Sequence, residues 1–89
     1  MKIRLAPAHL HERGDASALK ALVTSSVMPE DQVEHVHVRA VSGQYDVSIF
    51  LSARDLATAQ LNGTVLSSRL LRDYLPGWTL RKAWYEPAV

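Results

Sequence analysis

Two stretches of alternating apolar and polar residues, joined by a two-residue turn, constrain the fold of this chain most. They are Val33–Val41 and Tyr45–Leu51, with Ser42-Gly43 between them. Strict alternation over such a length is typical of a half-buried strand, and a Ser-Gly pair between two such stretches is typical of a β-hairpin. The sequence therefore predicts two adjacent antiparallel strands that share one apolar face, formed by Val36, Val38, Ala40, Val47, Ile49 and Leu51.

The rest of the chain predicts two helices and two further strands around this hairpin. Met1–Ala6 alternates like a short strand, and Asp15 is a suitable N-cap for a helix that follows it. Residues 52–55 have the spacing of a capping box, and a helical pattern then runs to Leu75. Trp78–Tyr85 is the last predicted strand, and the poor alternation at its end predicts a bulge.

The predicted order of elements is β-α-β-β-α-β, which resembles the ferredoxin-like plait. That resemblance implies an α+β fold with a four-stranded antiparallel sheet in the order 4-1-3-2 and two helices on one face. It concerns the order of elements alone, and many unrelated functions share it. The length of 89 residues fits one domain covering residues 1–89, and residues 86–89 are expected to form a loose tail.

Composition limits the classes of function. Lys and Arg number 10 against 9 Asp and Glu, so the formal charge of +1 gives no global positive field for nucleic acid or anionic lipid. The chain has no cysteine, which excludes disulfides and thiol chemistry. It shows neither a signal-peptide pattern nor an apolar stretch of membrane-spanning length, so we expect a cytoplasmic protein without a membrane partner.

The four histidines form two His-x-His pairs, His9 with His11 and His35 with His37. Such spacing on a strand can hold a divalent metal, but the topology predicts that the two pairs lie toward opposite ends of the sheet. We therefore predict no metal site, and the alternative is a site across a dimer interface with Asp46 or Glu34 as a further ligand. Because imidazoles change charge near neutrality, His35 and His37 beside Arg39 could make an interface weaken in acid.

The sheet face away from the helices is the first candidate surface. It is predicted to carry Lys2, Arg4, His35, His37, Arg39, Asp46, Ser48, Phe50, Arg81 and Tyr85. Three interpretations are open: a solvated face, a homodimer interface, or a nucleic-acid surface on which bases stack on Phe50. The negative charge of Asp46 counts against the third.

The long second helix offers another candidate surface. If the helix is straight, Ala57, Leu61 and Val65 lie well away from its main apolar stripe and form an exposed apolar patch. If Asn62-Gly63 breaks the helix, the helical phase changes at that point, and Leu61 and Val65 both face the core.

These observations favour a small non-enzymatic protein-interaction or regulatory module that forms a homodimer and needs no cofactor. No P-loop, dinucleotide-binding, zinc-protease or nucleophile-elbow motif occurs. The predicted interaction residues are Arg4, His35, His37, Arg39, Phe50, Arg81 and Tyr85 on the sheet face, and Ala57, Leu61 and Val65 on the helix. The alternative is a dimeric ligand-binding protein or enzyme with a pocket between subunits, lined by His35, His37, Tyr45 or Tyr85. Single-stranded nucleic-acid binding on the basic sheet face is the third possibility.

Overall fold

The structure is a computed structural model, and it describes residues 1–7 and 16–85. The predicted cap at Asp15, the pair His9 and His11, and the predicted tail all lie outside these residues. The elements are β1 (Lys2–Ala6), α1 (Ala16–Ser26), the short 3₁₀ helix η1 (Pro29–Asp31), β2 (Val33–Val41), β3 (Gln44–Leu51), α2 (Leu56–Arg69), the π-helical turn η2 (Leu70–Tyr74) and β4 (Thr79–Trp84).

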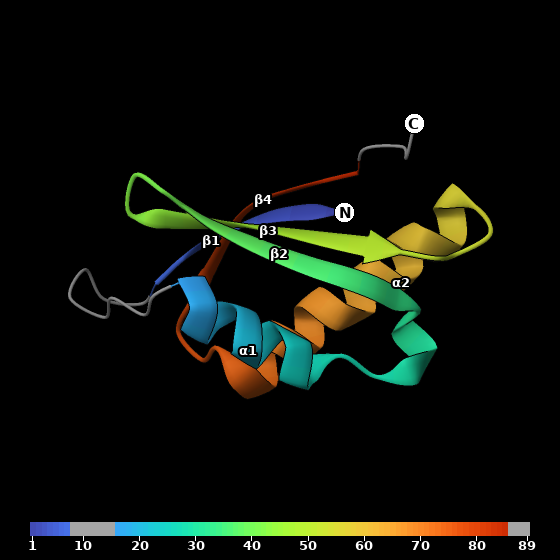
Figure 1. Cartoon of the computed structure of the whole chain (residues 1–89), viewed down its shortest axis with the longest axis horizontal. Helices are drawn as coiled ribbons and strands as arrows, with labels where there is room; N and C mark the ends of the chain where they lie inside the picture. The colour runs from blue at the N-terminus through green and yellow to red at the C-terminus, as the bar shows by residue number, and fades with distance from the viewer. Residues whose placement is uncertain (8–15, 86–89) are drawn as a thin grey trace.

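The four strands form one sheet in the order β2-β3-β1-β4, and every neighbouring pair is antiparallel. β1 and β3 are therefore central, and β2 and β4 are the edges. Figure 1 shows α1 and α2 on the same side of this sheet. The predicted α+β class, with a four-stranded antiparallel sheet and two helices, is confirmed.

The hairpin between β2 and β3 is the predicted one. Ser42 and Gly43 both have positive φ angles, 48° and 79°, as the central residues of a type I′ turn require. The register then pairs Val41 with Gln44 and continues to Val33 with Leu51. The face of the hairpin that carries Val36, Val38 and Val47 consequently points toward the helices.

The core lies between this face and the helices. Its buried members from the strands and helices are Ile3, Leu5, Val36, Tyr45, Val47, Ile49, Leu19, Val23, Leu66, Leu70 and Leu75. Tyr45 contacts Trp78, with ring centroids 5.7 Å apart. Because Tyr45 is buried in this core, it cannot line a cavity on the uncovered face of the sheet.

The start of α2 corrects the predicted capping box. Asp55, not Ser52, is the N-cap, and its Oδ1 accepts a hydrogen bond of 2.7 Å from the Thr58 nitrogen. Ser52 is engaged elsewhere, because its backbone nitrogen and its hydroxyl both donate to the Gln32 carbonyl. The pairing of β2 with β3 thus extends one step further and delays the helix.

α2 runs without a break through Asn62 and Gly63, so the interpretation with a reset phase is wrong. Gly63 is buried, and a Cβ atom there would lie 2.5 Å from the Met1 sulfur and 2.7 Å from the Tyr85 hydroxyl oxygen. Glycine at this position therefore allows the side chains of Met1 and Tyr85, which flank β1 and β4, to approach the helix closely. Within residues 1–7 and 16–85, no helix is both long and apolar enough to cross a membrane.

Candidate functional site

The uncovered face of the sheet carries polar side chains in rows that cross the strands. Cross-strand partners lie about 5 Å apart, so each row is a set of neighbours. The charged row is formed across β2, β3, β1 and β4 by Arg39, Asp46, Arg4 and Lys82. The mixed row beside it is formed in the same order by His37, Ser48, Lys2 and Trp84. The third row contains His35 and Phe50.

Two arginines cover the carboxylate of Asp46. Arg4 donates from Nε to Oδ1 at 2.7 Å and from Nη2 to Oδ2 at 3.0 Å, while Arg39 Nη2 lies 3.7 Å from Oδ2. The Asp46 side chain is only 10% exposed, whereas that of Arg39 is 70% exposed. The hydrogen bonds from Arg4 lower the pKa of Asp46. The acid therefore stays ionised beneath a surface of guanidinium groups.

A hollow of about 330 Å³ opens beside this ion pair. Its lining residues come from all four strands and are Lys2, Arg4, His37, Arg39, Asp46, Ser48 and Trp84. The Lys82 ammonium lies 5.1 Å from the centre of the Trp84 ring, which is within the range of a cation–π contact. The hollow thus combines an indole wall with a concentration of cationic groups.

Two residues predicted on this face are not in its rows. The Tyr85 hydroxyl donates to the Gln60 carbonyl of α2 at 3.1 Å, so this side chain lies on the helix side. Arg81 is the inserted residue of a bulge, because the register pairs Arg4 with Lys82 and Leu5 with Leu80. This confirms the predicted bulge, and it reverses the faces beyond it, because one extra residue turns every later side chain to the other side. Lys82 and Trp84 occupy the face instead.

Phe50 is exposed, as the alternation in β3 predicts. Its side chain is packed against His35, with ring centroids 5.6 Å apart, and the residue is 52% exposed. A large aromatic ring half in water beside cationic rows is available for contact with a ligand or a partner.

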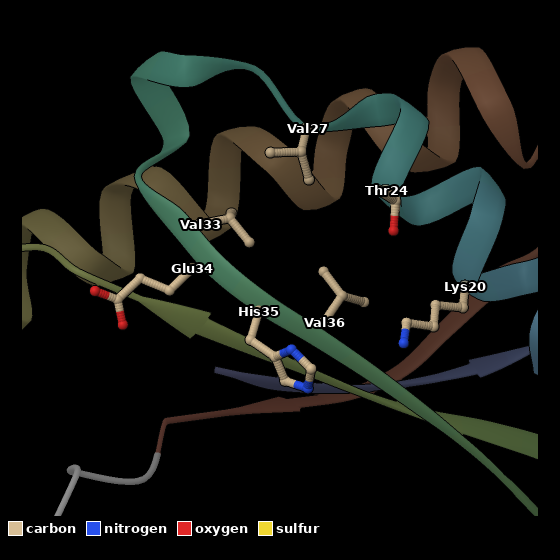
Figure 2. A pocket seen from close by; sticks show the side chains of 7 residues that line it. All are labelled: Lys20, Thr24, Val27, Val33, Glu34, His35 and Val36. Carbon is tan, nitrogen blue, oxygen red and sulfur yellow. The ribbon is translucent and has the colours of Figure 1, made fainter.

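The second candidate site is the outer edge of β2. A groove of about 330 Å³ runs between this strand and α1. Figure 2 shows its lining residues, which are Lys20 and Thr24 of α1, Val27 directly after it, and Val33, Glu34, His35 and Val36 of β2. Three valines make the wall beside the edge apolar.

The two edges of the sheet differ in their protection. Natural edge strands are kept from pairing with other chains by lysine, proline or a bulge. β4 carries a bulge together with Arg81 and Lys82. β2 has an irregularity only near its start, between Val33 and His35, and it carries Glu34 and Arg39 but neither lysine nor proline. β2 is therefore the less protected of the two edges.

The third candidate site is the exposed face of α2. In the continuous helix, Ala57, Leu61 and Val65 follow one another at intervals of four residues and form one row. Leu61 is 64% exposed and Val65 47% exposed. This is the exposed patch that a straight helix predicts.

His35 and His37 are exposed on β2. Among the residues that the structure describes, no group of three histidine, aspartate or glutamate side chains is arranged to hold a metal ion.

Comparison of the chain with protein-family models, with curated proteins and with solved structures finds no match.

Proposed function

We propose that this chain is a small protein-interaction or regulatory module that works as a homodimer, and that its subunits join through the β2 edges. The observation that carries this proposal is the difference between the two edges of the sheet. The bulge of β4 is flanked by two cations, while β2 pairs without a register shift over residues 35–41 and begins beside the valines of the groove.

A partner strand at this edge would gain both hydrogen bonds and apolar contacts. An edge strand presents unpaired backbone N–H and C=O groups along its outer side. Alternate side chains of an added strand would point toward the α1 side of the sheet, where Val27, Val33 and Val36 form the wall of the groove (Figure 2). Small β-branched side chains suit that space.

A second copy of β2 provides such side chains. Antiparallel pairing about a two-fold axis keeps the apolar side of one β2 next to that of the other, since residues opposite each other lie on the same face. Val36 and Val38 of each copy then meet above the two α1 helices. Small chains bury a low fraction of their surface, so the joining of two sheets into one would also give this protein a larger core.

The fold that we propose for this module is the ferredoxin-like plait. The order of elements along the chain and the central position of β1 and β3 support it. A cytoplasmic location stays a prediction from the sequence.

An enzymatic pocket between subunits receives less support. Of its four suggested lining residues, Tyr45 is buried in the core and Tyr85 is bonded to Gln60. Only His35 and His37 are exposed on the surface concerned. Two exposed side chains on one strand do not form the cleft that acid–base catalysis requires, so we favour interaction over catalysis.

The test is to place a charge at the β2 edge and to measure the solution mass by sedimentation equilibrium. Ala40→Lys and Ala40→Glu introduce either sign of charge at an exposed position whose cross-strand partner is Tyr45. Ala83→Lys and Ala83→Glu are the matched controls, since Ala83 is an exposed alanine on β4 opposite Ile3.

We expect the wild-type chain and both Ala83 variants to be dimers, and both Ala40 variants to dissociate at least about tenfold more readily, because a charge must be desolvated at the joint. Circular dichroism would verify that each variant is folded. A monomeric wild-type chain would overturn the proposal, and so would equal weakening by the substitutions on both edges.

A further inference from the structure

We infer that the uncovered sheet face binds a short single strand of nucleic acid, with bases contacting Phe50 and Trp84 and phosphates held by Arg39 and Lys82. This activity goes beyond dimer formation and uses a different surface. It is carried by the charged row, the hollow and the two aromatic side chains described above.

The charge on this face suits a polyanion much better than the total charge of the chain suggests. Within the described chain, the charged and mixed rows contain four cations, Lys2, Arg4, Arg39 and Lys82, but one carboxylate, Asp46. The formal charge of the whole chain is only +1, so positive charge is concentrated here. Phosphate groups bind such cationic surfaces with release of counterions.

Asp46 does not oppose this binding as its sequence position suggests. Its carboxylate accepts two hydrogen bonds from Arg4, lies 3.7 Å from Arg39, and is nearly buried beneath them. A phosphate approaching the face therefore meets guanidinium groups first. Arg39 is 70% exposed, which leaves most of this side chain accessible to a ligand.

The aromatic side chains indicate an oligonucleotide rather than a free nucleotide. Phe50 lies on β3 and Trp84 on β4, two strands and one row apart. Strand geometry places their Cα atoms about 12 Å apart. One base cannot stack on both rings, whereas successive nucleotides of a flexible strand can reach both. Because a ring stacks only on a base whose face is free, the ligand is single-stranded.

The position of this face allows binding by the proposed dimer. Pairing through the β2 edges extends the sheet sideways and leaves its uncovered face open. Stacking of two sheets face to face would cover Phe50, Arg39 and the hollow. Nucleic-acid binding and edge dimerisation therefore fail independently of each other, and each has its own measurement.

The experiment measures the fluorescence anisotropy of a labelled oligothymidine about ten nucleotides long, titrated with the full chain at several salt concentrations. Arg39→Gln is compared with Arg72→Gln, because Arg72 is equally exposed and also lies beside an aspartate, Asp73, on η2. Phe50→Ala is compared with Leu61→Ala, a second exposed apolar residue, located on α2. Circular dichroism verifies the fold of each variant.

We expect binding that weakens as salt rises, a loss of about fivefold or more in Phe50→Ala, and a loss in Arg39→Gln together with a salt slope smaller by about one. The Arg72→Gln and Leu61→Ala variants should bind like the wild-type chain. Each subunit of the Ala40→Glu variant should still bind the oligothymidine, so a failure of dimer formation can be told apart from a failure of nucleic-acid binding.

Four outcomes would overturn the inference. They are no binding at low salt, equal losses in the paired variants, equally tight binding of a duplex of the same length, and equally tight binding of thymidine monophosphate. The last would indicate a nucleotide site, and equal losses would indicate general attraction to positive charge.

Discussion

The guanidinium group of Arg69 on α2 donates hydrogen bonds to both carboxylate oxygens of Asp31, at 2.8 and 3.2 Å, and thereby fastens this helix to the turn before β2. The same guanidinium donates to the Ser26 carbonyl at the end of α1, and Asp31 also accepts from the Met28 nitrogen. Both side chains are largely buried. Arg69 therefore joins α2 both to η1, through Asp31, and to the end of α1, through Ser26.

Replacing Asp31 with asparagine should lower the free energy of unfolding by about 3 kcal/mol, because the Arg69 charge is left buried without its partner. Urea denaturation at pH 7 measures this loss. The matched control is Asp73→Asn, since Asp73 forms an exposed pair with Arg72, and solvent-exposed pairs contribute little to stability. Equal losses in the two variants would show that burial does not govern this interaction.

The same pair predicts how stability depends on pH. Hydrogen bonds from Arg69 lower the pKa of Asp31 below its usual value of 3.8, so the unfolded chain takes up the proton first as the solution becomes acidic. The stabilisation is complete above that usual value and is lost as pH falls through the lower pKa of the folded state. The difference in unfolding free energy between the wild-type chain and Asp31→Asn should therefore shrink below about pH 4. A difference that stays constant from pH 7 to pH 3 would contradict this assignment.

Leu61 and Leu66 lie on the same helix, but truncation should cost much more stability at Leu66 than at Leu61. Leu66 is fully buried, so Leu66→Ala removes core contacts and leaves a cavity, at a cost of about 3 kcal/mol. Leu61 is 64% exposed, so Leu61→Ala should change stability by no more than about 0.5 kcal/mol. Thermal unfolding of both variants provides the comparison. A large loss in Leu61→Ala would mean that the patch is already covered, for instance by a partner subunit.

The strands were predictable because their alternation is local. The valine pattern of β2 and β3 determines which side faces the helices, and the Ser42-Gly43 turn fixes their register. The last strand was predictable in position but not in orientation. A bulge at Arg81 depends on pairing with β1, and sequence periodicity does not locate such an insertion. For this reason the sequence places Tyr85 on the uncovered face, where Trp84 is found instead.

Features that depend on tertiary contacts could not be predicted from the sequence. Ser52 and Asp55 are both good capping residues, and the bonds from Ser52 to Gln32 decide between them. The low helix propensity of glycine favours a break at Gly63, but the close approach of Met1 and Tyr85 explains why glycine occupies this position in a continuous helix. The pairing of Asp31 with Arg69 spans 38 residues and has no local signal.

The proposed dimer should dissociate more readily in acid. Pairing through β2 brings His35, His37 and Arg39 of one copy next to those of the other, on the uncovered face. Histidine side chains gain positive charge between pH 8 and pH 5.5, so repulsion across the joint increases. The groups packed around them are Phe50 and Ser48 on β3, Asp46 beside Arg39, and Glu34 and Lys20 at the groove. Asp46 is already occupied by two arginines, which leaves Glu34 as the nearby acid that could offset the added charge.

Sedimentation equilibrium at both pH values measures this effect, and we expect dissociation at least about threefold easier at pH 5.5. A variant with both histidines replaced by glutamine should lose most of the difference. Equal dimer affinity of the wild-type chain at the two pH values would contradict the prediction.

Asp46→Asn should move stability and nucleic-acid binding in opposite directions. The substitution weakens the paired hydrogen bonds from Arg4, and because Arg4 is partly exposed and can be rehydrated, we expect a loss of only about 1 to 2 kcal/mol. It also removes a negative charge from the hollow and frees Arg4 and Arg39 for phosphate, so the oligothymidine should bind several-fold more tightly and with a steeper salt dependence. Asp73→Asn frees an arginine in the same way on a surface remote from the sheet face, and should leave binding unchanged. Weaker binding by a folded Asp46→Asn variant would mean that the carboxylate positions Arg4 and Arg39 for the ligand. The pairing of Asp46 with these arginines would then help binding directly, and would not merely cancel an unfavourable negative charge.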